Sequence, residues 1–268
     1  MKRERFILPD GGDLAWYEAG NGRPLVLLHG WATSASVFSE LVAMLADDFR
    51  LLIPDLPGHG ASSPAVQNDL ESIATTLNCW LATIESPPVA LGGWSLGGML
   101  ALEMARQKPQ RIDRLLLIGT SPRFTSGDDW TFGLPEVQVR ALGRNLARRF
   151  ETTLADFFNL AFAGEDISKE RLRAIRSFAV KQSPLPDQVA AMELLKGFSE
   201  QNQLDLLSHI DRPALVIHGG LDQITPLAAG RYLAASLPHG EFLEFPGVGH
   251  GPFLSRPQEV VDSILEFC

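Results

Sequence analysis

Several features are scarce in this chain of 268 residues, and each scarcity narrows the class of protein. Only two cysteines occur, Cys79 and Cys268, and their separation matches neither a metal-ligand spacing nor a redox motif. No run approaches the ~20 apolar residues that a membrane span needs, and residues 1–13 carry positive charges without the apolar stretch of a signal peptide. We therefore expect a cytoplasmic globular protein with no membrane association.

Composition and charge exclude further classes. The formal net charge of −9 argues against nucleic acid or an anionic membrane as the main partner. The six histidines lack metal-ligand spacing, and the glycine-rich loops lack the residues that complete a phosphate-binding or dinucleotide-binding motif. We predict no metal and no cofactor, and we expect a monomer.

The pattern of apolar residues indicates an α/β protein with an interruption. Residues 5–19 predict a strand pair that turns at 10–13. Apolar runs typical of buried parallel strands alternate with helical patterns and then return near the end of the chain: strands at 24–29, 49–55, 89–92, 114–119, 214–218 and 241–245, and helices at 37–45, 70–84 and 257–267. Between 121 and 207 only helices are expected, over 140–163, 167–181 and 186–199.

This order predicts a doubly wound, mostly parallel sheet with an inserted helical segment. Residues 1–120 and 208–268 would form the core, and residues 121–207 the insertion. An insertion that follows a strand of a parallel sheet lies at the carboxyl edge, where such folds bind ligands. We therefore interpret the insertion as a lid over the site.

The segment Gly93-Trp94-Ser95-Leu96-Gly97 is a G-x-S-x-G turn between a strand and a helix. So tight a turn strains the backbone of Ser95 and lifts its hydroxyl away from the sheet. It also places Ser95 at a helix N-terminus, where free N–H groups favour negative charge. Alone the motif is weak, because similar turns hold phosphates or simply pack tightly.

A serine nucleophile needs a base, and the base needs a group that orients it. In this topology the expected order along the chain is serine, acid, histidine. Asp222 and His250 follow the strands at 214–218 and 241–245, so we predict His250 as the base and Asp222 as its orienting acid. His218 is a poorer base because it ends a strand before the acid. Taken singly, His250 fits a solvated loop residue and Asp222 a turn former.

The tetrahedral oxygen of an acyl transfer needs two N–H donors. We assign these to the backbone of Leu96, directly after the serine, and of Trp31, in the loop after the strand at 24–29. His29 in this loop fits a structural role better than a chemical one, and the turn at 55–60 is interpreted as structural.

These motifs resemble the α/β-hydrolase superfamily over nearly the whole chain, in the order LHGW, PDLPGHGASS, GGWSLGG, HGGLDQITP and GVGHGPF. A narrower resemblance is to the pimeloyl-[acyl-carrier protein] methyl ester esterases of biotin synthesis. It rests on the tryptophan after His29-Gly30, on the GWSLGG elbow, and on the segments TSPRFTSGDDWTFGLP and FETTLADFFNLAF.

The resemblance implies a serine carboxylesterase that hydrolyses the methyl ester of pimeloyl-acyl-carrier protein through a Ser95-His250-Asp222 triad. It also implies that the acyl channel is lined by a stretch of the lid, namely Phe157, Phe158, Asn159, Leu160 and Ala161. From the residues alone, the aromatic and leucine side chains of this stretch fit the core of the lid equally well.

An acidic carrier protein requires a basic dock, and the lid is basic. Residues 140–181 carry nine Lys or Arg against five Asp or Glu, a net +4, so the rest of the chain carries −13. The resemblance places the dock on Lys169 and Arg173, although Thr152 and Asp156 stand where the family has arginines. Five other cations are alternatives: Arg144, Arg148, Arg149, Arg171 and Arg176. A solvated helix face explains the same charges.

Two other functions stay open. A broad carboxylesterase or a carbon–carbon bond hydrolase shares the elbow and the triad and differs in pocket shape. The other hypothesis is a binding or receptor protein on the same fold, and the intact Ser95, Asp222 and His250 argue against it.

Overall fold

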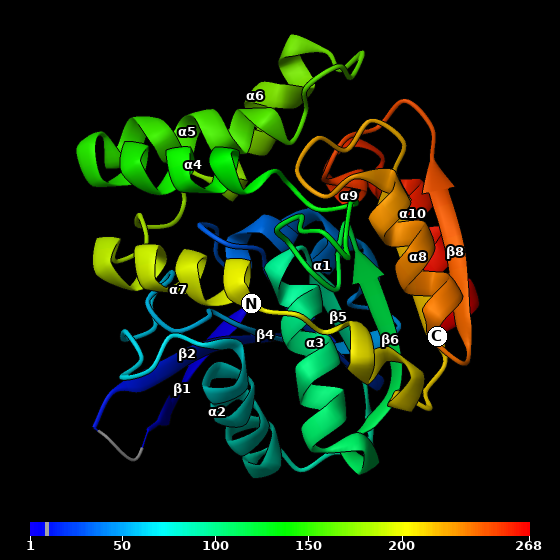
Figure 1. The fold of residues 1–268 in the computed structure, drawn as a ribbon. Coiled ribbons are helices and arrows are strands. Elements are labelled where there is room, and N and C mark those ends of the chain that lie inside the picture. Colours follow the sequence, from blue (N-terminus) through cyan, green and yellow to red (C-terminus); the bar gives the residue numbers. More distant parts are fainter. Residues whose placement is uncertain (9–10) are drawn as a thin grey trace.

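An eight-stranded sheet lies at the centre of the molecule (Figure 1), and the computed structural model describes residues 1–8 and 11–268. The strand order is β1-β2-β4-β3-β5-β6-β7-β8; β2 runs antiparallel to its neighbours, and the other neighbouring strands are parallel. The strands are β1 (Lys2–Ile7), β2 (Asp13–Ala19), β3 (Arg23–Leu28), β4 (Phe49–Pro54), β5 (Val89–Trp94), β6 (Ile112–Ile118), β7 (Ala214–Gly219) and β8 (Gly240–Phe245). The predicted strand pair is present, but part of its predicted turn, Asp10, lies outside the described residues.

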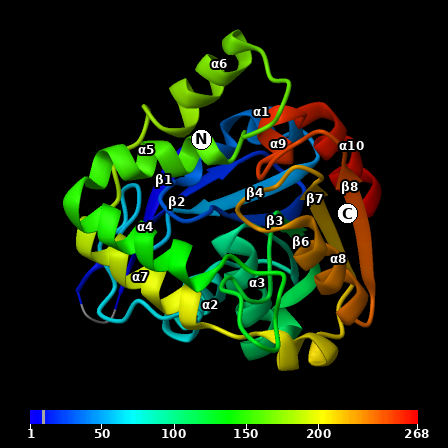
Figure 2. The ribbon, with the colours of Figure 1, turned by 45° about the horizontal axis from the view of Figure 1, so that its top comes forward.

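Helices cover both faces of the sheet, as the doubly wound pattern predicts (Figure 2). The helices α2 and α3 pack against each other on one face, where α8 also lies, and α1 and α10 pack together on the other. Their bounds are α1 (Ser39–Leu45), α2 (Leu70–Thr83), α3 (Leu96–Gln107), α8 (Leu227–Ser236), α9 (Pro252–Ser255) and α10 (Pro257–Phe267). Strands β5 and β7 are buried along their whole length, which is consistent with their mostly apolar sequences.

Four α-helices and a short 3-10 helix (Leu204–His209) separate β6 from β7, and the four α-helices lie over the carboxyl ends of the parallel strands (Figures 1 and 2). They are α4 (Glu136–Arg148), α5 (Phe150–Leu160), α6 (Lys169–Ala179) and α7 (Gln188–Glu200). We call residues 121–207 the helical segment. Its sequence pattern places it at the edge where a parallel sheet binds ligands.

The prediction of one helix over 140–163 is wrong. The backbone of Arg149, at φ −146° and ψ 61°, leaves the helical region, and α4 and α5 pack against each other on either side of it. Neither glycine nor proline marks this break, so the sequence pattern runs through it. The predicted helix at 37–45 begins instead with a 3-10 turn, Ala35–Phe38, before α1. Within the described residues, no helix is long and apolar enough to span a bilayer.

Candidate active site

Ser95 occupies a strained turn between β5 and α3. Its backbone has φ 56° and ψ −117°, a positive φ that only one other described non-glycine residue, Ala32, adopts. The Ser95 N–H donates to the carbonyl of Ile118 on the neighbouring β6 at 2.9 Å. The turn is therefore tied to the sheet, and the side chain projects from the start of a helix, as the motif predicts.

Glycines around Ser95 make the turn possible. A Cβ on Gly93 would lie 2.2 Å from the carbonyl of Gly97, and one on Gly97 would lie 2.1 Å from the carbonyl oxygen of Leu28. On Gly98 a Cβ would lie 1.9 Å from the Thr120 hydroxyl. Because these contacts are far inside van der Waals distance, α3 can approach β3 and β6 this closely only with glycine at all three positions.

Asp222 and His250 form a buried pair at the carboxyl ends of β7 and β8. The imidazole Nδ1 of His250 donates to Asp222 Oδ2 at 2.8 Å, because a carboxylate can only accept. This contact fixes the proton on Nδ1 and leaves Nε2 unprotonated, which is the tautomer that a base requires. Two further hydrogen bonds hold the backbone of His250: its N–H donates to Ala161 O, and Trp94 Nε1 donates to its carbonyl oxygen, both at 2.8 Å.

The Asp222 carboxylate is surrounded by donors. The backbone N–H groups of Ile224 and Thr225 bind Oδ1 at 2.8 and 2.9 Å, and the Thr225 hydroxyl donates to Oδ2 at 2.8 Å. Burial by itself raises the pKa of Asp222, but the charge of His250 and the hydrogen bonds from His218 and His250 outweigh it and hold the pKa well below its usual range. The carboxylate is thus ionised wherever the protein is folded near neutral pH.

His218, predicted from the sequence to be a poorer base than His250, contacts the carboxylate of Asp222. Its Nε2 lies 2.7 Å from the carbonyl of Thr225 and 3.3 Å from Asp222 Oδ2, and its side chain is fully buried. A nitrogen that faces a carbonyl and a carboxylate must carry the proton, so His218 acts as a donor there. It supports the loop of Asp222 and cannot serve as a base for Ser95.

A narrow slot of about 20 Å³ opens at Ser95 and is also lined by His250. This volume holds about one water molecule. Aromatic and apolar side chains close it: Trp31, Trp94, Leu154, Phe157, Phe158, Ala161 and Ile224. Across the described residues, no protein acceptor is found for the backbone N–H groups of Trp31, which lines the slot, and of Leu96, which follows Ser95 directly in the chain.

Two buried histidines hold the loop that carries Trp31. His29 Nε2 accepts from the N–H of Leu56 at 2.9 Å, and His59 Nε2 accepts from the N–H of Ala32 at 3.2 Å. Burial lowers the pKa of each imidazole to about 4, so both are neutral at pH 7. These contacts are structural, as the sequence suggested for His29, and they fix the loop beside Ser95.

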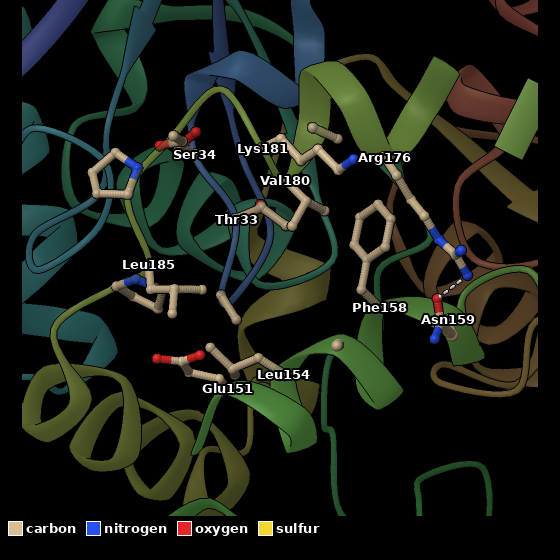
Figure 3. Close-up of a pocket in the computed structure, with 16 residues that line it drawn as sticks. Thr33, Ser34, Glu151, Leu154, Phe158, Asn159, Arg176, Val180, Lys181 and Leu185 are labelled. Atoms are coloured by element: carbon tan, nitrogen blue, oxygen red, sulfur yellow. Dashed lines mark hydrogen bonds between the residues drawn. The ribbon is translucent and has the colours of Figure 1, made fainter. Parts of the chain in front are cut away.

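A larger cleft of about 430 Å³ adjoins the slot (Figure 3). Ala32, Thr33, Leu154 and Phe158 line both, so they form the partition between them. The rest of the cleft is bounded by α5, the end of α6 and residues 183–186. Figure 3 shows Arg176 and Lys181 at one side, where Arg176 donates to Asn159 Oδ1 at 2.6 Å, and Glu151 at the other.

Comparison with known proteins identifies the family of the chain. A family model described as "alpha/beta hydrolase fold" matches residues 23–257. The chain belongs to the α/β hydrolase family. A pimeloyl-[acyl-carrier protein] methyl ester esterase from Chromobacterium violaceum is 34% identical to this hydrolase, covering 92% of this chain and 94% of its own. One from Xanthomonas oryzae is 36% identical, covering 92% and 96%. An esterase structure from Exiguobacterium antarcticum superposes with a TM-score of 0.91 at 21% identity, covering 99% of each chain.

The fold class and the resemblance read from the sequence are thereby confirmed. Among the residues predicted to line an acyl channel, the hydrolase places Phe157 and Ala161 at the slot, Asn159 at the cleft and Phe158 at both. Leu160 lines neither and is 36% exposed. The difference follows from helical geometry, because Leu160 lies on another face of α5.

The cations predicted for docking differ in their surroundings. Lys169 and Arg173 are exposed on α6, and no ion pair involving either is found among the described residues. Arg171, one of the alternatives, is instead bound to residues outside the helical segment: Nη1 donates to Glu40 Oε1 at 2.7 Å, and Nε donates to the carbonyl of Leu254. Arg171 is thus an anchor of α6 rather than a free cation.

Several residues at the site were not predicted from the sequence. Leu154, Thr33 and Ile224 line the slot, and Glu165 binds the loop of His250 through Gly249 N–H. These contacts join positions that are far apart in the chain, and an isolated loop residue such as Glu165 carries no local signal of them. In residues 1–8 and 11–268 no group of three or more His, Cys, Asp or Glu is arranged to hold a metal ion.

Proposed function

We propose that this hydrolase is a serine carboxylesterase that cleaves the methyl ester of a pimeloyl group carried on acyl-carrier protein. The observation that carries the chemistry is the hydrogen-bonded Asp222–His250 pair, whose imidazole lines the same slot as the strained Ser95. The substrate is suggested by relatives at 34–36% identity that bear this name and align over nearly their whole length.

In the acylation step His250 Nε2 takes the proton of the Ser95 hydroxyl as its oxygen attacks the ester carbonyl. The tetrahedral oxygen receives the N–H groups of Trp31 and Leu96. When the carbon–oxygen bond to the methoxy group breaks, His250 returns the proton to that oxygen, and methanol leaves. Asp222 stabilises the transient imidazolium, which its ionised carboxylate and buried position suit.

Deacylation repeats the sequence with water. His250 takes a proton from a water molecule whose oxygen attacks the acyl carbon, and the proton then passes to Ser95 as the acyl bond breaks. The product is the free carboxylic acid, still attached to the carrier by its other end. Ser95, His250 and Trp31 line the slot, Asp222 binds His250, and Leu96 follows Ser95 in the chain.

The acyl chain requires more room than the slot provides. A volume of about 20 Å³ accommodates one water, whereas the adjoining cleft of about 430 Å³ accommodates an extended aliphatic chain. We assign the chain and its linker to this cleft. The partition side chains Leu154 and Phe158 must then move aside when the ester reaches Ser95, because both border the slot and the cleft.

The exposed cations Lys169 and Arg173 of α6 are assigned to the acidic carrier protein. They lie on the helix whose C-terminal end contributes Arg176 and Ala179 to the cleft, so a carrier bound there would sit near the cleft mouth. Surface charges of this kind steer encounter and depend on salt.

A matched pair of substrates tests the proposal. The protein is incubated with the pimeloyl methyl ester on its carrier, and separately with a free monomethyl ester of the same acid, and loss of the methyl group is followed by mass spectrometry. We expect a much higher kcat/KM for the carrier-bound ester. Equal values would indicate a broad carboxylesterase, and no reaction with either would contradict esterase activity on this acid.

A further inference from the structure

Residues 161–171, which comprise the loop after α5 and the start of α6, bind the segment that carries His250. Five hydrogen bonds connect the two. Two of them reach backbone N–H groups next to each other: His250 N–H donates to Ala161 O at 2.8 Å, and Gly249 N–H donates to Glu165 Oε1 at 2.7 Å. The other three reach α9: Ser255 Oγ donates to Glu165 Oε2 at 2.6 Å, and Arg171 donates to Leu254 O from Nε at 3.0 Å and from Nη2 at 2.5 Å.

Glu165 occupies the centre of this contact. Its two carboxylate oxygens bind two different points on either side of His250, one residue before it and five residues after it. Charge-assisted hydrogen bonds of this length are stronger than neutral ones. Glu165 is half-buried, and its carboxylate binds both Gly249 N–H and Ser255 Oγ. These two partners hold the carboxylate in one orientation, and the carboxylate in turn restrains the loop of His250.

Gly249 makes the close approach possible. A Cβ at this position would lie 2.2 Å from the carbonyl oxygen of Ala161 and 2.8 Å from Glu165 Oε1. The backbone of the histidine loop is therefore in direct contact with the helical segment, with no side chain between them. A displacement of residues 161–165 would break the hydrogen bond at His250 N–H directly.

We propose that Glu165 is a positioning residue, which fixes the loop of His250 so that the imidazole faces Ser95 only while residues 161–171 are seated on α9. The inference rests on the proposed function, because it assumes that His250 is the base. The helical segment then does more than cover the slot: it completes the geometry of the base. Glu165 touches no reacting atom, and its effect passes through Gly249, Ser255 and the intervening backbone.

Three substitutions separate geometry from charge. Glu165→Ala removes both hydrogen bonds, and Glu165→Asp keeps the charge but shortens the side chain by one methylene, so that it cannot span both partners. Glu165→Gln loses the charge but keeps the reach, since its amide oxygen accepts from Gly249 N–H and its NH₂ group donates to Ser255 Oγ. Asp166→Ala, at the exposed neighbouring position, is the control.

Two readouts apply to each variant: kcat and KM on a short p-nitrophenyl ester, and the rate at which a fluorophosphonate labels Ser95. We expect the Ala and Asp variants to lose on the order of 10- to 100-fold in kcat and in labelling rate with little change in KM, as displacement of a catalytic group does. The Gln and Asp166→Ala variants should stay within about threefold of wild type.

The proton on His250 Nδ1, observed as a downfield NMR resonance, should broaden or vanish in the Ala and Asp variants and persist in the Gln variant. Wild-type kcat in Glu165→Asp would overturn the inference even if Glu165→Ala does not fold, and so would equal losses in the Gln and Asp variants. A wild-type protein that neither hydrolyses esters nor labels at Ser95 would instead contradict the proposed function.

Discussion

His250 donates through Nδ1 to Asp222 Oδ2 at 2.8 Å, and the acceptor is a fully ionised carboxylate with five donors around it. Asp222→Asn should therefore lower kcat by on the order of 10³- to 10⁴-fold, because an amide NH₂ group at this position would favour the wrong imidazole tautomer. Steady-state kinetics on a p-nitrophenyl ester, with circular dichroism to verify folding, measures the effect. A loss of less than tenfold would show that Asp222 does not orient the base.

The partition between slot and cleft leads to a prediction about chain length. Phe158→Ala removes a ring that lines both spaces, so the ratio of kcat/KM for an octanoate ester to that for an acetate ester should rise roughly tenfold. Leu160→Ala, two positions along α5 at a side chain that lines neither space, is the matched control and should leave the ratio unchanged. The assignment of the acyl chain to the cleft fails if both variants behave alike.

Charge reversal on α6 tests the carrier dock. The double variant Lys169→Glu, Arg173→Glu should lower kcat/KM on the carrier-bound ester by roughly 3- to 10-fold at low salt and leave a free ester unaffected. Raising the salt concentration should shrink the difference. Lys108→Glu, an exposed cation after the C-terminal end of α3, is the control. An unchanged rate on the carrier-bound ester would remove these two residues from the dock.

The buried histidines predict how stability depends on pH. The folded protein holds the pKa of His29 and His59 at about 4, below the ordinary 6.5, so the unfolded chain binds protons first as the pH falls. The contribution of each neutral imidazole is present above pH 6.5 and is lost as the pH falls from there towards 4.

Urea unfolding at pH 7 and pH 4.5 measures this loss. The free energy of unfolding of the wild type should fall by roughly 2 kcal/mol more than that of His59→Gln, whose amide oxygen can still accept from Ala32 N–H. His209→Gln, at an exposed position, should follow the wild type. The same fall in all three proteins would contradict neutral burial of His59.

The sequence predicts the placement of residues where that placement depends only on the order of strands. Ser95, Asp222 and His250 each come directly after a parallel strand, and such strands end at one edge of the sheet, so their convergence follows from topology. The break at Arg149 could not be read, because its cause is the packing of α4 against α5 rather than a residue that ends helices.

The residues that support the proposed triad could not be predicted from the sequence either. His218 and Glu165 act through contacts with Asp222 and Gly249 that only the folded chain creates, and both residues resemble ordinary strand-end or loop positions in sequence. Leu160 was predicted to line the acyl channel because it lies in an apolar stretch. In the structure it lies on an exposed face of α5.

Ser95 is the proposed nucleophile that hydrolyses the methyl ester of a carrier-bound pimeloyl group. The most direct test compares wild type with Ser95→Ala on that substrate, following the mass of the carrier as the methyl ester becomes an acid. We predict complete conversion by the wild type and a loss of at least 10³-fold in Ser95→Ala. Conversion at the wild-type rate by Ser95→Ala, or an ester left intact by the wild type, would contradict the proposed role of Ser95 in hydrolysing this ester.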